Sequence, residues 1–204
     1  MGRSRLKPES GSRVLTRESK QGLRIEFPGG YLRPLAPSDV HPAYVEGLND
    51  PEVNRFLVHV RKVRQTADIV TQYVEQNLRA SDAVLFGIWM NGDDHHCGTV
   101  RVHDLDPEHG PAHIGICIFE RRKWRAGVGV SAIRAVSGWA CGFLGLAAIE
   151  AGVYADNIGS QRAFMSAGYV WRKNVADLFE PGDSAPTVRV YEFSGPLDAP
   201  PESS

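Results

Sequence analysis

The stretch ICIFERRKWRAGVGVSAI at residues 116–133 decides the fold. An apolar strand pattern leads into a basic turn, two glycines follow at Gly127 and Gly129, and a helical pattern begins near Val130. Both glycines are expected to adopt positive φ and let a ligand approach the backbone, while unpaired N–H groups of the new helix point to the same place. The stretch therefore predicts a phosphate-binding turn. Its positive charges are Arg121, Arg122, Lys123 and Arg125.

The composition limits the classes of function. The chain has 204 residues, 42% of them hydrophobic, and its 23 basic residues nearly balance 24 acidic ones, which argues against a general nucleic-acid or membrane-surface binder. One domain is expected over residues 23–193, with a flexible basic tail at 1–22 and a flexible Pro/Ser-rich tail at 194–204. Three cysteines without the spacing of a disulfide framework, and the lack of an apolar signal region in residues 1–22, favour a cytoplasmic location.

The apolar periodicity predicts strands interrupted by helices. Residues 23–35 are predicted to form one or two strands broken at residues 28–30, and three strands at 84–90, 98–104 and 112–120 form an antiparallel meander. Further strands are expected at 147–154, 169–172 and 188–193.

Helix starts are indicated by capping residues. They are expected at Ser38 or Asp39, at Pro51 after the N-cap Asp50, and after Thr66. The helix after Thr66 should direct one apolar side toward the core, made of Ile69, Tyr73 and Leu78. Asn157 is expected to cap a last helix that ends at Gly168.

Four segments carry a resemblance to a known family: LRPLAPSDV at 32–40, NDPEVNRFL at 49–57, IGICIFERRKWRAGVGVSAI at 114–133 and IEAGVYADNIGSQRAFMSAGY at 149–169. In this order they resemble the GNAT superfamily of acetyl-coenzyme A (acetyl-CoA) dependent N-acetyltransferases. Within it they look like the branch of ribosomal-protein N-terminal and nucleotide-amino-sugar acetyltransferases, in which a tryptophan like Trp124 commonly replaces the Gln or Arg of the (Gln/Arg)-x-x-Gly-x-(Gly/Ala) signature.

The resemblance implies an α/β (α+β) fold, with a central mixed, mostly antiparallel sheet of about seven strands and helices on both faces. It also implies that the strand at 114–119 splays from the strand at 149–154 to leave a cleft for acetyl-CoA, with a backbone N–H there to stabilise the oxyanion of the tetrahedral intermediate. The implied cofactor-binding residues are Ile116, Cys117, Ile118, Arg122, Trp124, Arg125, Ala126, Gly127, Val128, Gly129, Val130, Asn157, Ser160 and Phe164.

Acetyl transfer to an amine needs a group that accepts a proton, because an ammonium has no lone pair to attack the thioester. His113 is the first candidate, since relatives often carry a carboxylate at this place and an imidazole can act as a base; alternatively it is a hydrogen-bonded histidine at a strand end. Glu150 is either an acid/base residue or a structural ion-pair partner. Tyr154 is either a substrate contact or a core or edge aromatic residue.

The leaving thiolate of coenzyme A must take up a proton. Many relatives supply it from a tyrosine of the last helix, a place that Phe164 occupies here. The ribosomal-protein branch uses the serine of an Asn-x-x-Ser motif, which Asn157 and Ser160 match. Ser160 therefore either donates this proton or bonds the backbone at the helix start, and water is a third possible donor.

A zinc site is the alternative use of the histidines and of Cys97. His95, His96, His103, His109 and His113 are suitable ligands in type, but their spacing matches no closed structural site. Several of them fall in expected turns, and the family needs no metal. We therefore expect no metal.

Two classes of function remain from the sequence. The first is an enzyme that acetylates a primary amine of a small molecule, such as an amino sugar, or a protein N-terminus, and acts as a monomer or homodimer. Arg55, Arg61 and Arg64 would suit a phosphate-bearing or acidic acceptor, or are simply solvated. The second is a catalytically silent CoA-binding module, an alternative that Phe164 in place of tyrosine keeps open.

Overall fold

The computed structural model describes residues 15–92, 95–105, 110–176 and 186–195. Within these ranges, eight strands form one sheet in the order β1-β2-β3-β4-β5-β6-β8-β7, in which β5 and β6 are parallel and all other neighbours are antiparallel. This confirms the expected mixed, mostly antiparallel sheet. The strands are β1 (Ile25–Phe27), β2 (Gly30–Pro34), β3 (Ala83–Met90), β4 (His95–His103), β5 (Ala112–Ile118), β6 (Ala148–Tyr154), β7 (Val170–Ala176) and β8 (Thr187–Ser194).

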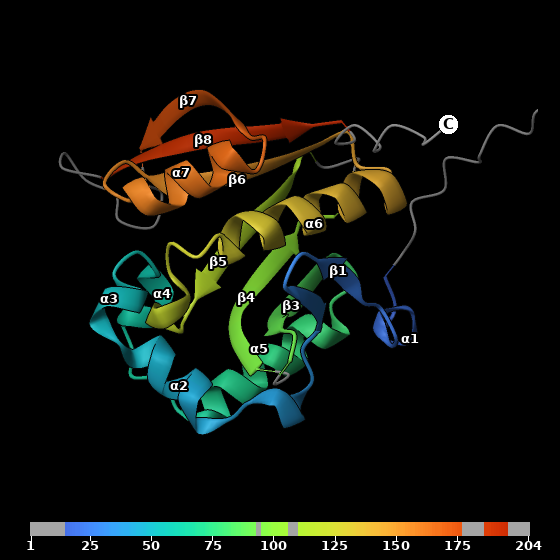
Figure 1. The fold of residues 1–204 in the computed structure, drawn as a ribbon, viewed down its shortest axis with the longest axis vertical. Helices are drawn as coiled ribbons and strands as arrows, with labels where there is room; N and C mark the ends of the chain where they lie inside the picture. Colours follow the sequence, from blue (N-terminus) through green and yellow to red (C-terminus); the bar gives the residue numbers. More distant parts are fainter. Residues whose placement is uncertain (1–14, 93–94, 106–109, 177–185, 196–204) are drawn as a thin grey trace, which may run out of the picture.

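Helices cover both faces of the sheet, as expected (Figure 1). Helices α6 (Val128–Phe143) and α7 (Ile158–Ser166) pack over one buried apolar cluster, while α2 (Pro42–Asn49) and α5 (Ala67–Arg79) pack over the other. Within the described ranges, none of the helices is both long enough and apolar enough to cross a membrane. The short helices are α1 (Arg17–Lys20), η1 (Pro37–Asp39), α3 (Pro51–Asn54), α4 (Val58–Arg61) and η2 (Arg121–Lys123).

The buried side of α5 differs from the prediction. Its start after Thr66 is confirmed, but Val70, Val74 and Asn77 are buried, whereas Ile69 and Tyr73 are exposed. The reason is a polar contact: the Oδ1 atom of Asn77 accepts a hydrogen bond of 2.7 Å from Nε of Arg101 on β4. A prediction based on apolar residues alone misses this buried face, because one of its three residues, Asn77, is polar.

The first long helix begins later than expected. The 3-10 turn η1 occupies Ser38 and Asp39, and α2 starts at Pro42 with His41 as its N-cap. Asp39 is engaged instead by the guanidinium of Arg33, at 2.7 and 2.8 Å, and by the backbone N–H of Ala36. The predicted N-cap role of Asp50 before Pro51 is confirmed.

The packed part of the chain also starts earlier than the expected boundary at residue 23. Leu15 is 4% exposed and Lys20 is 2% exposed, and the Nζ atom of Lys20 donates to the backbone carbonyls of Asn77 (2.8 Å) and Ala80 (2.5 Å). These carbonyls lie at the end of α5, where a helix has no internal donors left. Lys20 thus acts as a distant cap for α5. Residues 1–14 and 196–204 of the expected tails lie outside the described residues.

One edge strand of the sheet is short and the other is irregular. Strand β1 has three residues, and β7 pairs with β8 through a register shift between Trp171 and Lys173. Every residue of β7 is exposed. The edge strands therefore contribute little to the core, with Phe27 of β1 as their buried member.

A buried histidine lies among aromatic rings on the α2 side of the sheet. His96 is 2% exposed, its ring stacks on Trp89 at a centroid distance of 4.7 Å, and its Nε2 atom lies 3.0 Å from the carbonyl oxygen of Gly98. Burial, together with the neighbouring His41, lowers the pKa of His96 to about 3. The folded protein therefore holds this imidazole neutral.

Replacing Lys20 by methionine is expected to lower the free energy of unfolding by about 2 kcal/mol, because carbonyls at the end of α5 lose a charged donor. Urea denaturation measures the change. Arg17→Met is the matched control, since Arg17 is exposed in the same short helix. Equal stability of the two variants would contradict the capping role of Lys20.

The stability of the protein is expected to fall as the pH drops below about 6.5, where unfolded histidines take up protons but His96 in the folded state does not. The unfolded state then binds more protons, so the free energy of unfolding decreases toward pH 4. Urea denaturation of the wild type and of His96→Gln across this range measures the effect. A pH dependence equally steep in both proteins contradicts the assignment to His96.

Candidate active site

Strands β5 and β6 pair over only two residue pairs, Ala112/Ile149 and His113/Glu150. Beyond them, in the described part of the chain, the edge of β5 that faces β6 has no strand partner. Figure 1 shows the two strands diverging toward the side of the molecule where α3, α4 and the start of α6 lie. The predicted separation of these strands is therefore confirmed.

Helix α6 starts at Val128, two residues before the predicted start, with Gly127 as its N-cap. Gly127 has φ +79°, as predicted, but the expected positive φ of Gly129 is wrong because Gly129 already lies within the helix. The N–H of Ser131 donates to the carbonyl of Gly127 at 3.0 Å. The N–H groups of Val128, Gly129 and Val130 are the ones left without an intrahelical acceptor.

Gly129 has a different use from the one predicted. A Cβ atom at this position would lie 3.6 Å from Cδ1 of Ile116 and 3.9 Å from Cγ1 of Ile118, on the side of α6 that faces β5. A larger side chain would therefore occupy the space between the helix start and the strand. The glycine keeps this space open.

The basic turn before α6 is partly tied to acidic side chains. Arg121 lies 3.4 Å from the carboxylate of Asp50, and Nε of Arg122 donates to Glu120 at 2.6 Å. Arg125 is exposed and has φ +60°. Arg125 and Gly127 both have positive φ. Turns in which left-handed residues alternate with other conformations often form backbone concavities that bind anions. Ala126, between Arg125 and Gly127, is exposed as well.

Trp124 is fixed against the end of β5. Its indole Nε1 donates to the backbone carbonyl of Ile118 at 2.8 Å, so this carbonyl is already engaged. The Cys117 side chain packs in the cluster on the α2 side, and burial raises the pKa of its thiol to about 12. Cys117 therefore contributes main chain rather than a thiolate.

The first turn of α7 matches its prediction, but Phe164 does not. Asn157 is the N-cap, and its Oδ1 atom accepts from the N–H of Ser160 at 3.1 Å. Phe164 is 2% exposed and packs edge-on against Tyr169 at a centroid distance of 5.0 Å. The structure therefore corrects the cofactor-binding role predicted for Phe164, since its ring belongs to the hydrophobic core.

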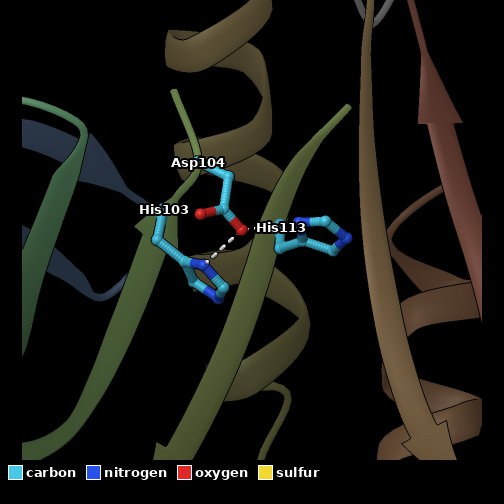
Figure 2. A group of neighbouring side chains, drawn as sticks. All are labelled: His103, Asp104 and His113. Atoms are coloured by element: carbon cyan, nitrogen blue, oxygen red, sulfur yellow. Dashed lines mark hydrogen bonds and ion pairs between the residues drawn. The ribbon is translucent and has the colours of Figure 1, made fainter. Parts of the chain in front are cut away.

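His113 lies at the point where β5 and β6 separate, and it is held by a residue that the sequence analysis missed. The Oδ2 atom of Asp104 lies 2.9 Å from Nδ1 of His113 and 2.8 Å from Nδ1 of His103. Figure 2 shows the Asp104 carboxylate between the two imidazole rings. On the other side, Nε2 of His113 lies 3.9 Å from Oε2 of Glu150. The structure thus brings His113 and Glu150 together.

Asp104 reaches this place through an uncommon backbone. It directly follows β4 and has φ +57°, a conformation that asparagine and aspartate adopt more readily than most other residues. The available sequence signal was the meander itself, since pairing β4 with β5 places His103 opposite His113. Nothing in the sequence indicated that the backbone at Asp104 would adopt positive φ and direct the carboxylate to the two histidines.

A pocket of about 320 Å³ lies at the end of β6. Tyr154 stacks on Phe56 with centroids 6.1 Å apart, and both line this pocket together with Arg55 and Arg61. Arg64 does not line this pocket. Its lining residues are Arg55, Phe56, Arg61, Tyr154, Ala155, Asp156, Pro186 and Thr187.

The residues weighed as zinc ligands separate into different environments. His95 contacts the Glu120 carboxylate at 2.5 Å, His96 is buried among aromatic rings, and Cys97 is buried in the other core cluster. His103 and His113 lie side by side with Asp104 between them, and His109 lies outside the described residues.

Comparison with known proteins agrees with this geometry. A family model described as an acetyltransferase (GNAT) domain matches residues 31–170. No match was found among curated protein sequences.

Solved structures share the fold. A GNAT-family acetyltransferase from Bacillus anthracis has a TM-score of 0.72 at 19% identity, over 84% of this chain and 98% of its own. A Vibrio cholerae protein assigned as a ribosomal-protein-serine acetyltransferase has a TM-score of 0.70 at 18% identity, over 89% and 100%. Spermidine N-acetyltransferase from Vibrio cholerae, in complex with CoA and spermine, has a TM-score of 0.68 at 15% identity, over 80% and 94%.

At these identities the solved structures establish the fold, while the family model covers well over half of the chain. The open β5/β6 pair and the glycine-capped α6 are the parts of that fold on which the site is built. The chain therefore belongs to the GNAT acetyltransferase family.

Proposed function

We propose that the protein is an acetyl-CoA-dependent N-acetyltransferase that moves the acetyl group to a primary amine by direct attack. The observation that carries the proposal is the opening of the β5/β6 pair directly beyond His113 and Glu150, toward the glycine-capped start of α6. Unpaired main chain, titratable side chains and an anion-binding helix start lie together there. The acceptor is a small molecule, such as an amino sugar, or a protein N-terminus.

The residues at the start of α6 fit the cofactor. Acetyl-CoA supplies an acetyl group in a reactive thioester and carries a pyrophosphate. The free N–H groups of Val128, Gly129 and Val130 would hold the pyrophosphate, each favourable contact with the helix end contributing about 0.3–1 kcal/mol. Arg125 would add a charge-assisted contact, and the unpaired edge of β5 would bind the pantetheine arm as an added strand does.

His113 is the group that we assign as general base. Asp104 accepts a hydrogen bond from Nδ1–H, which leaves the lone pair on Nε2, the nitrogen on the side of β6. Nε2 would take the proton of the acceptor ammonium, directly or through water. Glu150, 3.9 Å away, would stabilise the imidazolium that forms. In the alternative assignment Glu150 is the base and His113 is its neighbour at the same place.

Ser160 is the proposed proton donor to the leaving thiolate. Its N–H is held by Asn157 at the first turn of α7, close to where β6 ends. The cap fixes the backbone of Ser160 and leaves its hydroxyl for this role. Asn157 would also contact the pantetheine arm.

The pocket at Tyr154 would receive the acceptor. Two guanidinium groups, those of Arg55 and Arg61, line it, and they favour a phosphate-bearing or acidic acceptor. Spermidine, which one structural neighbour acetylates, is polycationic and would be repelled by these arginines. We therefore propose an acceptor unlike a polyamine, and we further propose a cytoplasmic monomer or homodimer without nucleic-acid or membrane partners.

Gly129→Glu is expected to abolish acetyl-CoA binding, because its side chain adds bulk and negative charge between α6 and β5, where the pyrophosphate would lie. Binding is measured as the rise in melting temperature with added cofactor. Gly142→Glu is the matched control, since it adds the same charge at the other end of α6 in open space. Equal stabilisation of both variants by acetyl-CoA would falsify the proposed pyrophosphate site.

Release of free thiol from acetyl-CoA with a panel of primary amines tests the activity. The wild type is expected to turn over at least one phosphate-bearing or acidic amine, and His113→Ala to lower kcat/KM about 10²–10⁴-fold. His95→Ala, which removes another carboxylate-paired histidine, should keep the wild-type rate.

Ser160→Ala is expected to lower kcat more than it raises KM, because the proton is needed only as the thiol leaves. Cofactor binding without turnover of any amine would favour the silent CoA-binding module instead. Full activity of His113→Ala at all pH values would remove His113 from the mechanism.

A further inference from the structure

The pair formed by His103 and His113 is set by the register of two strands. They face each other across the antiparallel β4/β5 pair, and their rings lie nearly parallel with centroids 5.5 Å apart. Asp104 then turns back at φ +57°, so that one carboxylate oxygen lies between the two Nδ1 atoms. Three potential metal ligands from two strands therefore converge on one point (Figure 2).

The size of this cluster is close to that of a zinc site. The Oδ2 atom of Asp104 lies 2.8 and 2.9 Å from the two Nδ1 atoms, and all three atoms lie within 4.8 Å of one another. Ligands around a tetrahedral Zn²⁺ at bond lengths near 2.1 Å are about 3.4 Å apart. Rotations of these side chains about their χ angles would adjust the spacing to admit the ion. Two imidazoles and one carboxylate are also a ligand set that zinc accepts, with water as the fourth ligand.

The charges around the cluster are mixed. The carboxylate of Asp104 attracts a cation, and the carboxylate of Glu150 lies on the far side of His113. Arg101 acts against a bound cation, although its Nε atom is turned to Asn77.

The carboxylate of Glu150 favours the orientation of His113 in which Nδ1 faces the metal. When Nδ1 of His113 binds a metal, Nε2 carries the proton, and this atom lies 3.9 Å from Oε2 of Glu150. Carboxylates that face the outer nitrogen of a ligating histidine fix its tautomer and raise its basicity. The cluster is also open to ions from solvent, since the side chains of His103, Asp104 and His113 are 31%, 56% and 42% exposed.

We propose that His103, Asp104 and His113 form a Zn²⁺ site that regulates this protein. No metal was expected from the sequence, because the histidine spacing matches no closed structural site, several of the residues fall in expected turns and the family needs none. Asp104 was not among the residues considered. Ligation draws His113 away from Asp104 and puts the proton on Nε2. Bound zinc therefore inhibits acetyl transfer, a consequence that rests on the proposed role of His113 as base.

Isothermal titration of the untagged protein with ZnCl₂ at pH 7.5 tests the site without any cofactor or acceptor. One Zn²⁺ per chain is expected to bind, and the substitution Asp104→Asn, which keeps the shape of the side chain, should weaken binding at least tenfold. His103→Ala should have a similar effect. Titration with Co²⁺ should give the visible absorption of a tetrahedral ion in the wild type only.

His95→Ala is the matched control, because His95 is on the same strand, is 35% exposed and also contacts a carboxylate. Its zinc affinity should equal that of the wild type. Thermal melts confirm that each variant is folded. No zinc binding by the wild type, or affinity unchanged in Asp104→Asn and His103→Ala, overturns the proposal.

The inhibition is measured separately, as loss of thiol release on adding ZnCl₂ and its recovery with a chelator. Asp104→Asn and His103→Ala, assayed for whatever basal rate they keep, should lose most of this sensitivity. Zinc binding without inhibition would remove the regulatory role and count against His113 as the base, while leaving the metal site intact. An inactive protein that still binds zinc would contradict the proposed function alone.

Discussion

Parallel pairing between β5 and β6 stops after two residue pairs, and the rest of the site depends on this break. Unpaired backbone groups that are buried cost free energy, so such an edge is stable only where water or a ligand can reach it. The chain leaves β5, passes through the basic turn and α6, and returns as β6. Because α6 packs on the sheet beside both strands, it fixes the separation that the break begins.

The same break places different chemistry at its two ends. At the closed end, His113 and Glu150 lie side by side on neighbouring strands. At the open end, the start of α6 presents backbone donors next to a turn with exposed Arg125. One connection between two parallel strands thus carries both the proposed proton-accepting pair and the proposed anion-binding surface, and the distance between them follows from the length of β5.

Local signals predicted most of the fold. Alternating apolar residues marked the meander, and the caps at Asp50 and Asn157 were correct because each depends on neighbouring backbone alone. Contacts between distant segments were missed. Lys20 reaches the end of α5 across 57 residues, and a charged side chain in an apparently polar tail gives no sign of such a partner.

The candidate site shows the same division between local signals, which the sequence carries, and contacts between distant segments, which it does not. The order of residues in the chain was enough to nominate His113, Glu150 and the glycine turn as candidates, whereas it gave no reason to nominate Asp104. Its position follows from a left-handed backbone after β4 and from the register of two strands together. Phe164 was predicted to contact the cofactor because it occupies the place of a tyrosine in many relatives. That correspondence does not show which way the ring points, and the ring is buried in the core.

The ends of the sheet have a consequence for assembly. An edge strand with free N–H and C=O groups is a template on which another chain can add a strand. Here β1 offers only three residues, and the bulge in β7 interrupts the regular row of donors and acceptors beside the charged Arg172 and Lys173. The edge at β1 is therefore a poor starting point for intermolecular β-sheet, whereas β7 exposes Val170, Trp171 and Val175, so its bulge and its two charged side chains are what limit the addition of a further strand there.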